Sequence, residues 1–599
     1  MIAAGLLLFS LFSSLALGRP TAHDVFHVHE KRSDVPNGFK YVGKAAPNAT
    51  LDLRIALVQS DPAGLEAALY DVSTPGNKNY RKHLTKAQAD AFIAPKPESV
   101  QAVTTWLAKN NVTAQTSATG EWMKIRIPVS QANALLDTQF NEYSHDETGL
   151  TVLRTMSYSV PASVKGHLDF IYPATAFVAP RPVPAELQIM QSRETSTHGI
   201  SKRARGNRKS RTTLNSIPAM TSTATSKPAQ ATGPVSPDDS CKTKITPACL
   251  QAIYNIPPDS ALNTSSNIFV ASFVGESADP ADLKKFLGEF RPDVSQGTTF
   301  RVKAVDGGTN NASKATIEAS LDVQYTVGVA AGVDTTFVSV GSNNTDGIAG
   351  FLDVINDLIS QEEPPFVLTT SFGFNEKDVP VGLANNLCNA YAKLGARGTT
   401  IIFGSGDGGV AGIQNQNCTT FVPTFPSSCP FVTSVGGTNS FGPEVAVSFS
   451  AGGFSNVFAR PKYQDDVVPA YLKTLGSTNK GLFNASGRGF PDIAAQAKSF
   501  QVVRGGQTIS VSGTSAAGPT VAGVVALLND AVFQDGGQPL GFLNPLLYSS
   551  AASALNDITQ GNNPGCGTDG FPTSEGWDPV TGLGTPDFAK LLDVVKKSS

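Results

Sequence analysis

The chain has 599 residues, of which 40% are hydrophobic and 16% are charged, a composition typical of a globular protein with more than one domain. Its formal net charge of −3 is divided unequally: residues 1–240 carry 25 Lys and Arg against 19 Asp and Glu, and residues 241–599 carry 21 against 30. Neither part is basic enough to indicate a nucleic-acid-binding protein. All seven histidines lie before residue 199, so we expect the chemistry of the larger C-terminal part to proceed without imidazole.

Residues 1–18 are typical of a secretory signal peptide. The apolar run from Leu6 to Leu17 ends in the small-x-small sequence Ala16-Leu17-Gly18 and is shorter than the roughly 20 residues of a membrane span. Seven Asn-x-Ser/Thr sequons agree with a glycosylating pathway, and six cysteines, all after residue 240, favour disulfide bonds. We therefore expect a secreted, extracellular protein without a membrane anchor. Which of the 15 pairings that six cysteines allow is formed stays open.

Residues 36–182 have the pattern of one compact α+β module. Their apolar periodicity predicts strands at 53–58 and 123–127 and amphipathic helices at 63–70 and 130–140. We assign this module to a domain over residues 19–191. Residues 192–240 are rich in Ser, Thr, Lys, Arg, Pro and Ala with almost no large apolar residue, so they predict an exposed linker that a protease can cut.

From Cys241 onward, short and nearly continuous apolar runs alternate with helical patterns. We expect strands at 268–274, 335–340, 366–370, 399–403 and 431–435, and helices at 316–331 and 348–359. Runs of this kind predict a mostly parallel sheet that is covered by helices on both faces. Residues 241–599 are therefore predicted to form one α/β domain.

The sharpest local signal is the sequence Ser512-Gly-Thr-Ser515, which follows a strand-like region over 502–511 and opens an apolar helical run. Ser515 is thus expected at a helix N-terminus, where the helix dipole and free N–H groups favour a developing negative charge. It is a candidate nucleophile, although a serine in this position can also simply cap the helix. Because no histidine follows residue 198, its base would have to be a carboxylate or a lysine.

Three acidic residues are candidates for this chemistry. Glu318 and Asp322 are spaced i, i+4 on a predicted helix and share one face, among mostly apolar or small neighbours. An acidic pair of this kind usually lies on a solvated face. If both carboxyl groups are buried, however, their pKa values move apart, so that one group keeps its proton and shares it with the other. Asp407 lies in a Gly-rich loop that follows a predicted buried strand, a position where α/β sheets place functional groups. The alternative is that Asp407 is an ordinary turn residue.

Taken together, these motifs resemble one family. The ordered set on a histidine-free α/β domain is similar to the sedolisins, the serine-carboxyl peptidases that include secreted fungal tripeptidyl-peptidases: Glu318-x-x-x-Asp322, Ser405-Gly-Asp407 and Ser512-Gly-Thr-Ser515. The sequences over 80–85, 425–438 and 576–582 extend the resemblance to an activation domain and to the C-terminal region. It implies a subtilisin-like, mostly parallel sheet with flanking helices, preceded by a ferredoxin-like α+β propeptide domain.

The resemblance also implies roles for the four candidate residues. Ser515 would be the nucleophile, Glu318 its general base and Asp322 the residue that orients Glu318. Asp407 would lie in the oxyanion hole and stay protonated, so that its O–H can donate to the tetrahedral intermediate. A carboxylate base and a protonated carboxyl donor are compatible only in acid, so we expect an acidic optimum and little turnover at about pH 7.5.

A single Ca²⁺ ion is implied near the C-terminus. Asp557 and Asp578 match the family's calcium site, where the backbone carbonyls of Ile558, Ser574 and Gly576 would complete an oxygen shell suited to a hard cation. Ser574 replaces the family's usual glycine, but a carbonyl ligand does not depend on the side chain. The alternative is that two acids simply lie in a Gly-rich loop.

The function that we expect is that of a secreted, acid-active peptidase that releases tripeptides from the free N-termini of polypeptides. The preference for N-termini rests on the family alone, and a sedolisin-type endopeptidase that cuts internally is the alternative. An inactive binding protein is disfavoured because every expected catalytic residue is present. The positive N-terminal third and the negative catalytic part predict a propeptide that inhibits its own chain until acid weakens their attraction. We expect a monomer.

Overall fold

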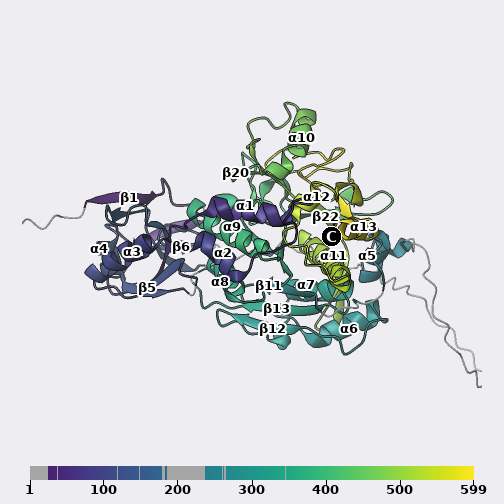
Figure 1. Cartoon of the computed structure of the whole chain (residues 1–599), viewed down its shortest axis with the longest axis horizontal. Helices are drawn as coiled ribbons and strands as arrows, with labels where there is room; N and C mark the ends of the chain where they lie inside the picture. The colour runs from purple at the N-terminus through teal and green to yellow at the C-terminus, as the bar shows by residue number, and fades with distance from the viewer. Residues whose placement is uncertain are drawn as a thin grey trace, which may run out of the picture.

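The computed structural model describes residues 25–36, 38–117, 119–146, 149–178, 183–184, 237–258, 261, 265–344 and 346–598. The predicted signal peptide and nearly all of the predicted linker lie outside these residues, as does the sequon at Asn263. Figure 1 shows two parts: a smaller one from the N-terminal third and a larger one that starts at residue 237. The exact domain boundaries stay predictions.

The smaller part is built on a four-stranded antiparallel sheet with the order β4-β5-β3-β9. Its strands and helices are β3 (Thr50–Leu57), α1 (Pro62–Ser73), α2 (Lys86–Ile93), α3 (Pro97–Lys109), β4 (Ala114–Thr116), β5 (Trp122–Pro128), α4 (Val129–Leu135) and β9 (Leu168–Tyr172). Alternate residues of β3 and β5, such as Leu53 and Ile125, point into one core with α3 and α4. This order and pairing are those of a ferredoxin-like fold, which confirms the predicted propeptide architecture.

Five further strands belong to this part. β1 (Phe26–Lys31) pairs with β8 (Ser157–Pro161), while β2 (Phe39–Lys44), β6 (Asn141–His145) and β7 (Thr151–Arg154) form a three-stranded sheet. The helix predicted over 130–140 was too long, because α4 ends at Leu135. Asp137 adopts a left-handed conformation with φ 42°, and the side chain of Asn133 accepts the N–H of Phe140, so the chain turns back into β6.

The larger part is built on an eight-stranded sheet with the order β12-β13-β11-β14-β16-β18-β19, in which β22 also pairs with β18. Every pair is parallel except β18 with β19. The strands are β11 (Asn267–Ser272), β12 (Arg301–Val305), β13 (Asp334–Val340), β14 (Val367–Thr370), β16 (Thr400–Gly404), β18 (Thr433–Asn439), β19 (Val445–Ala446) and β22 (Ile493–Gln496). The predicted mostly parallel sheet is thus confirmed.

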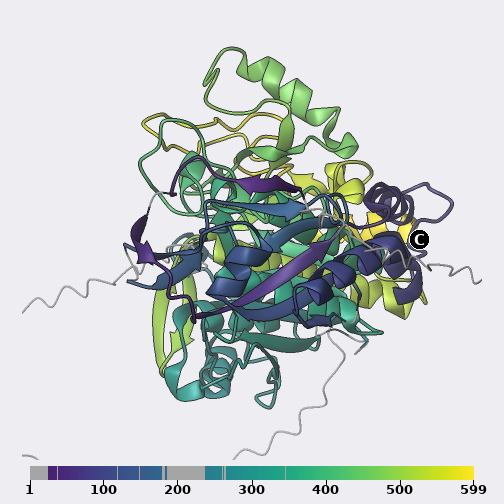
Figure 2. The ribbon, with the colours of Figure 1, turned by 90° about the vertical axis from the view of Figure 1, so that its left-hand side faces the viewer.

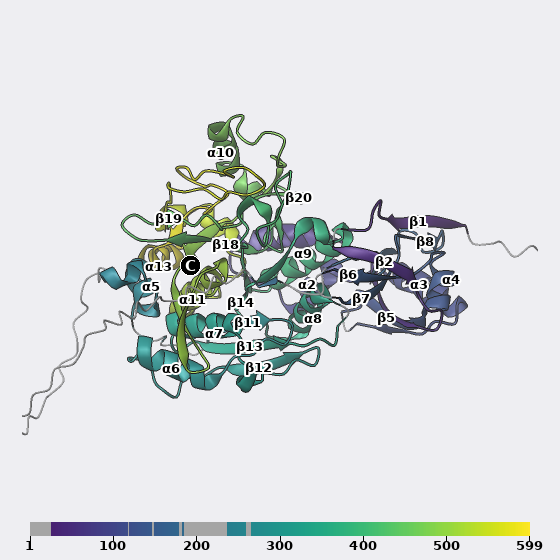
Figure 3. The same ribbon diagram turned by 180° about the vertical axis from the view of Figure 1, so that it is seen from behind.

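Helices cover both faces of this sheet (Figures 1 and 3). On one face α7 (Ile317–Val329) and α11 (Thr514–Gln534) pack in the same core as Ile268 of β11, whereas α8 (Gly347–Ser360) and α9 (Val381–Ala396) pack on the other face with Ala271 of the same strand. Burial on both faces explains why the strands are continuous apolar runs. The remaining helices of this part are α5 (Pro247–Ile253), α6 (Pro280–Phe290), α10 (Val467–Leu475), α12 (Asn544–Leu547) and α13 (Phe588–Lys597).

Helix α11 runs through the centre of this domain. Within the described part of the chain it alone is long and apolar enough to cross a membrane, but 89% of its most apolar window is buried inside the fold. Its composition therefore reflects a core position. The single strand-like region that we expected before it, over 502–511, is in fact a hairpin of β23 (Phe500–Arg504) and β24 (Gln507–Val511). Gly505 and Gly506, both with positive φ, form its two-residue turn.

All six cysteines are paired, as Cys241–Cys249, Cys388–Cys429 and Cys418–Cys566. The expected disulfide bonds are confirmed, and the structure selects one pairing from the possibilities that the sequence left open. Three disulfides in one domain are typical of proteins from oxidising compartments.

The two parts meet at the layer formed by α8 and α9. Apolar residues of the smaller part, including Leu69 and Trp122, join the same core as these helices, and Figure 2 shows the smaller part lying across one side of the larger one. Ion pairs with buried or half-buried side chains cross this boundary. They are Arg54 with Asp353, Arg154 with Asp346, and Lys393 with both Asp90 and Glu121.

Candidate active site

The four predicted catalytic residues come together at the carboxyl edge of the sheet. Asp407 follows β16, and Ser515 is the second residue of α11, which packs across the middle of the sheet. Helix α7 lies against α11 and carries Glu318 and Asp322 to the same place, where Glu318 interacts with Asp322, Ser515 and Asp407. Residues that are up to 197 positions apart therefore form one cluster, where α/β sheets place their ligands.

Ser515 does not cap its helix. Its side chain is 1% exposed, and its Oγ makes no hydrogen bond within the described residues. The start of α11 is held instead by Asp407, whose Oδ1 accepts the N–H of Thr514 at 2.8 Å, and by Gly406, whose N–H donates to the Thr514 hydroxyl at 3.1 Å. The Ser515 hydroxyl is thus left for chemistry, and Asp407 is more than an ordinary turn residue.

Glu318 and Asp322 form a buried carboxyl pair, so the alternative of a solvated face is wrong. Glu318 is 2% exposed and Asp322 is fully buried. Burial and the neighbouring Asp322 raise the pKa of Glu318 well above its ordinary value, which the Ser515 hydroxyl partly offsets. Burial likewise raises the pKa of Asp322, against the effect of a hydrogen bond from Ser371. Two acids in such a site share a proton rather than ionise together.

Neither oxygen of Glu318 has a hydrogen-bond partner of ordinary geometry among the described residues. The interaction with Ser515 is close enough to affect the pKa of Glu318 but is not an aligned hydrogen bond. Long or poorly aligned contacts of this kind are usual in sites without substrate and become shorter when substrate binds. A serine hydroxyl and a carboxyl group are therefore adjacent in a buried site, an arrangement that is compatible with nucleophilic catalysis without histidine.

Comparison with known proteins agrees with this geometry. The family described as Pro-kumamolisin, activation domain, matches residues 37–177, and the subtilase family matches residues 242–551. Tripeptidyl-peptidase SED2 of Arthroderma otae is 34% identical over 98% of both chains, and tripeptidyl-peptidase SED4 of the same organism is 36% identical over 99% of this chain and 98% of its own. The chain belongs to the subtilase family. The resemblance inferred from the motifs is confirmed.

A solved structure of Pseudomonas sedolisin, a serine-carboxyl proteinase complexed with pseudo-iodotyrostatin, is also similar to this subtilase-family chain. It is 23% identical and covers 59% of this chain and 99% of its own, with a TM-score of 0.49.

Two residues of the cluster were missed by the sequence analysis. Ser371 directly follows β14, and its hydroxyl donates to Asp322 Oδ1 at 2.7 Å while lying 3.4 Å from the backbone oxygen of Ser515. Glu276 follows β11, accepts a hydrogen bond from Thr316, and raises the pKa of both Glu318 and Asp322 through its charge. Their positions just after parallel strands were a usable signal, because all such ends meet at one edge.

A short strand from the N-terminal part lies close to this cluster, in a small sheet separate from the eight-stranded one. β10 (Val183–Pro184) pairs antiparallel with β15 (Phe372–Asn375), which begins one residue after Ser371. Val183 lies opposite Gly373 and Pro184 opposite Phe372. A segment of the chain that precedes the larger domain therefore occupies the sheet edge that leads to the catalytic cluster.

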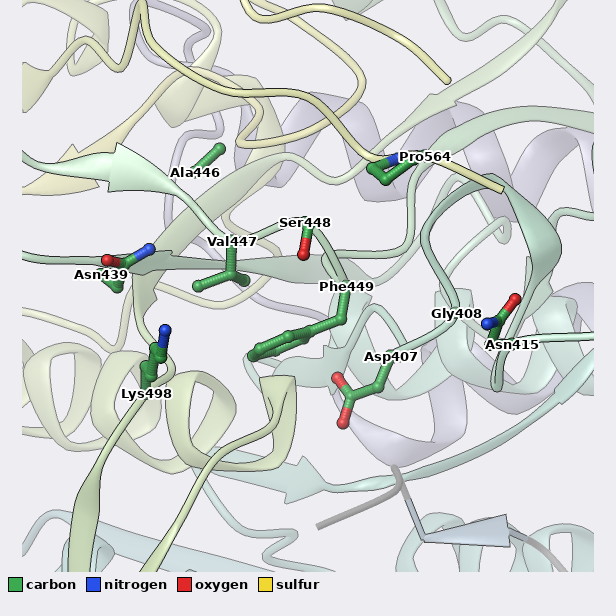
Figure 4. A pocket seen from close by; sticks show the side chains of 10 residues that line it. All are labelled: Asp407, Gly408, Asn415, Asn439, Ala446, Val447, Ser448, Phe449, Lys498 and Pro564. Carbon is green, nitrogen blue, oxygen red and sulfur yellow. The ribbon is translucent and has the colours of Figure 1, made fainter. Parts of the chain in front are cut away.

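Beside Asp407 the surface opens into a cavity of about 500 Å³ (Figure 4). Its walls come from the loops after β16 and β22, from Asn439 at the end of β18, from the segment 446–449 and from Pro564. Asp407 borders the cavity and also accepts the N–H of Thr514, so the cavity adjoins the site. No residue of β15 lines it.

The five predicted calcium ligands lie in two neighbouring loops. Asp557 Oδ2 accepts the N–H of Gly576 at 2.8 Å, and Asp578 Oδ2 accepts the N–H of Ser574 at 3.1 Å, so the two carboxyl groups face one loop. Asp578 is fully buried with no cationic partner among the described residues, and burial raises its pKa to about 7. Within the same residues no group of three His, Cys, Asp or Glu side chains could hold a metal, so backbone carbonyls would have to supply the other ligands.

Proposed function

We propose that this subtilase-family serine peptidase acts through a Ser-Glu-Asp triad, in acid, and releases tripeptides from the free N-termini of polypeptides. The observation that carries the proposal is the burial of Ser515 together with the Glu318–Asp322 carboxyl pair in a domain without histidine. The curated relatives at 34% to 36% identity, which span nearly the whole chain, are named tripeptidyl-peptidases.

In this mechanism the Oγ of Ser515 attacks the carbonyl carbon of the scissile peptide bond. Glu318 in its ionised form takes the hydroxyl proton and later gives it to the leaving amine. Asp322, held by the hydroxyl of Ser371, keeps Glu318 in position and carries the proton that the pair shares. The acyl-enzyme that forms on Ser515 is then hydrolysed by water through the same proton transfers.

The negative charge that develops on the carbonyl oxygen needs donors. We assign these to the protonated carboxyl group of Asp407 and to the backbone N–H groups at the start of α11. One oxygen of Asp407 already accepts the Thr514 N–H, so the other oxygen is the one that would carry the donated proton. The enzyme then works only where Glu318 is ionised while Asp407 is protonated.

A peptide substrate would add to the edge of β15, where β10 lies in the precursor. The activation domain thereby inhibits its own chain, since the edge is occupied and the domain is held by buried ion pairs. The three disulfides fit a secreted protein. The monomeric state and the occupancy of the sequons stay predictions.

One Ca²⁺ ion would be held by the carboxylates of Asp557 and Asp578 and by the carbonyl oxygens of Ile558, Ser574 and Gly576. The donor set fits, because it contains oxygen only, and because none of these three carbonyls accepts a hydrogen bond within the described residues. When bound, the ion neutralises the buried carboxylate of Asp578 and ties the two loops together.

The test of the proposed activity uses two peptides that differ only in a free or an acetylated N-terminus, incubated with the acid-treated full chain. Release of a tripeptide from the free peptide alone supports the proposal, and equal internal cleavage of both peptides supports the endopeptidase alternative. Ser515→Ala and Glu318→Gln should each lower kcat by at least about 10³-fold. An undiminished rate in Glu318→Gln would exclude the triad.

The pH profile of Asp407→Asn tests the oxyanion donor. Burial and Asp322 raise the pKa of Glu318, so the wild-type rate should rise with pH on the acid side, and it should fall towards neutrality as Asp407 loses its proton. An asparagine amide donates at every pH, so the fall at higher pH should move towards neutrality or disappear, whatever the maximal rate. Asp407→Ala, which has no donor, should lose about 10²–10³-fold relative to the maximal wild-type rate, and the difference should shrink where wild-type Asp407 is ionised. An unchanged fall in Asp407→Asn would contradict the assignment.

Removal of calcium should destabilise the protein. We expect a chelator to lower the melting temperature of the wild-type chain by about 5 °C, and added Ca²⁺ to restore it. Asp557→Asn should lose this response, whereas Asp569→Asn, an exposed acid of the same region, should keep it. Equal melting temperatures with and without chelator would speak against the site.

Processing of the precursor should depend on the ion pair between Asp90 and Lys393. Burial raises the pKa of Asp90, whereas the ammonium groups of Lys393 and Lys86 lower it. The net effect is a pKa below the ordinary value of 3.8. The pair therefore holds the domains together at higher pH and is lost as the pH falls through that lowered value. In Asp90→Asn this contact is already absent, so processing at about pH 5, followed by gel electrophoresis, should be about 5-fold faster.

Asp52→Asn is the control for that experiment, because Asp52 is paired with Arg126 inside the smaller domain and does not reach the larger one. A processing rate that is the same in Asp90→Asn as in the wild type would refute the role of this contact.

A further inference from the structure

The pairing of β10 with β15 gives the direction in which a peptide crosses the site. Along β10 the chain runs from Val183, opposite Gly373, to Pro184, opposite Phe372, and thus towards Ser371. Ser371 in turn contacts Asp322 and the backbone of Ser515. If a substrate binds along β15 in the same direction as β10, the residues that precede its scissile bond lie beside β15. The residues that follow the bond must leave the nucleophile on the side away from β15.

The cavity beside Asp407 borders the site and contains no residue of β15, so we assign it to that side. Only two charged side chains line it, Asp407 and Lys498. Figure 4 shows them on either side of the Phe449 ring. Under the proposed mechanism Asp407 is neutral when the enzyme works, so Lys498 is then the one charge on the wall of this cavity.

Lys498 is exposed, yet its backbone is fixed relative to the nucleophile. It lies between β22 and β23, where the N–H of Ala497 donates to Thr438 at 2.8 Å and the N–H of Ser499 donates to the hydroxyl of Ser512 at 3.1 Å. The N–H of Gly513 donates to the carbonyl of Ala497 at 2.8 Å. The segment that carries Lys498 is therefore tied directly to the turn that precedes Ser515.

No carboxylate of the described residues forms an ion pair with Lys498, although the domain as a whole carries more acids than bases. A lysine that only adds solubility would not need to be held at the edge of the catalytic cavity. A flexible ammonium group beside a bound peptide attracts a carboxylate, and pairs at partly exposed positions have small but measurable effects.

We propose that Lys498 is a specificity-determining residue that binds a carboxylate on the leaving part of the substrate, namely an Asp or Glu side chain on the first or second residue after the scissile bond. In a short substrate, the free C-terminal carboxylate is a second group that could bind Lys498 in the same way. The inference rests on the proposed function, because it assigns the cavity to the leaving part of a peptide.

The experiment compares peptides with a free N-terminus and a C-terminal amide that carry Glu or Gln as the fourth or the fifth residue. The full chain is first incubated at about pH 4, and kcat/KM is then measured at about pH 5.5, where a Glu side chain is ionised. The wild type should prefer Glu over Gln by about 2- to 5-fold at one of the two positions, and the preference should shrink at high salt.

Substitutions at residue 498 decide the question. Lys498→Met should bring the Glu to Gln ratio to 1, and Lys498→Arg should keep it above 1. Lys498→Glu should favour a peptide with Lys in that position over its Gln counterpart. Lys473→Met, on α10 and remote from the cavity lining, is the matched control and should keep the wild-type ratio.

A tetrapeptide with a free C-terminal carboxylate, compared with its amide, separates the two sources of the carboxylate. If only the free acid is preferred, and only when Lys498 is present, the ligand is the C-terminus and the proposed side-chain preference is overturned. Cleavage with a Glu to Gln ratio that is the same in the wild type and in Lys498→Met overturns the inference but leaves the proposed function standing. If no peptide is cleaved at all, both fall.

Discussion

A carboxylate can take a proton from a serine hydroxyl only where water does not compete for it and lower its basicity. In this chain that constraint is met by one helix, α7, which carries Glu318 and Asp322 one turn apart into the interior. Burial and the proximity of Asp322 raise the pKa of Glu318, so its ionised form would be a stronger base in the proposed mechanism. The arrangement of the other elements follows from the need to place Ser515 against this buried pair.

Close packing of the two central helices makes that placement possible. A Cβ atom at Gly523 of α11 would come within 2.7 Å of Val329 on α7, so only glycine lets the helices approach this far. At the other end, the loop after β16 reaches the start of α11, where Asp407 accepts the Thr514 N–H. The small residues of this segment therefore have two functions: they allow the tight turn before Ser515, and at Gly523 they let α11 approach the side chain of Val329 on α7.

Much of this could be predicted from sequence, because the signals were local. Continuous apolar runs gave the parallel strands, and the spacing of Glu318 and Asp322 placed both acids on one helical face. Ser371 has a local signal in its place just after a predicted strand, but its contact with Asp322 depends on the order of strands in the sheet, which the sequence does not show. The disulfide pairing has the same non-local origin. The hairpin before Ser515 was missed because the Gly505-Gly506 turn lies inside an otherwise uninterrupted β pattern.

The buried acids of this domain fall into two groups, and the contrast supports the assignment of the site. Asp492 is bonded on both oxygens, by Arg488, Ser434 and Tyr548, and Glu444 accepts hydrogen bonds from four side chains on its two oxygens. These acids stabilise the fold, because burial without partners would cost several kcal/mol. Glu318 is equally buried, yet neither of its oxygens is bonded. A fold that leaves both oxygens of Glu318 without a hydrogen bond among the described residues, while it bonds both oxygens of Asp492 and Glu444, leaves that group available for a ligand or a reaction, and the hydroxyl of Ser515 beside it fits the proposed reaction.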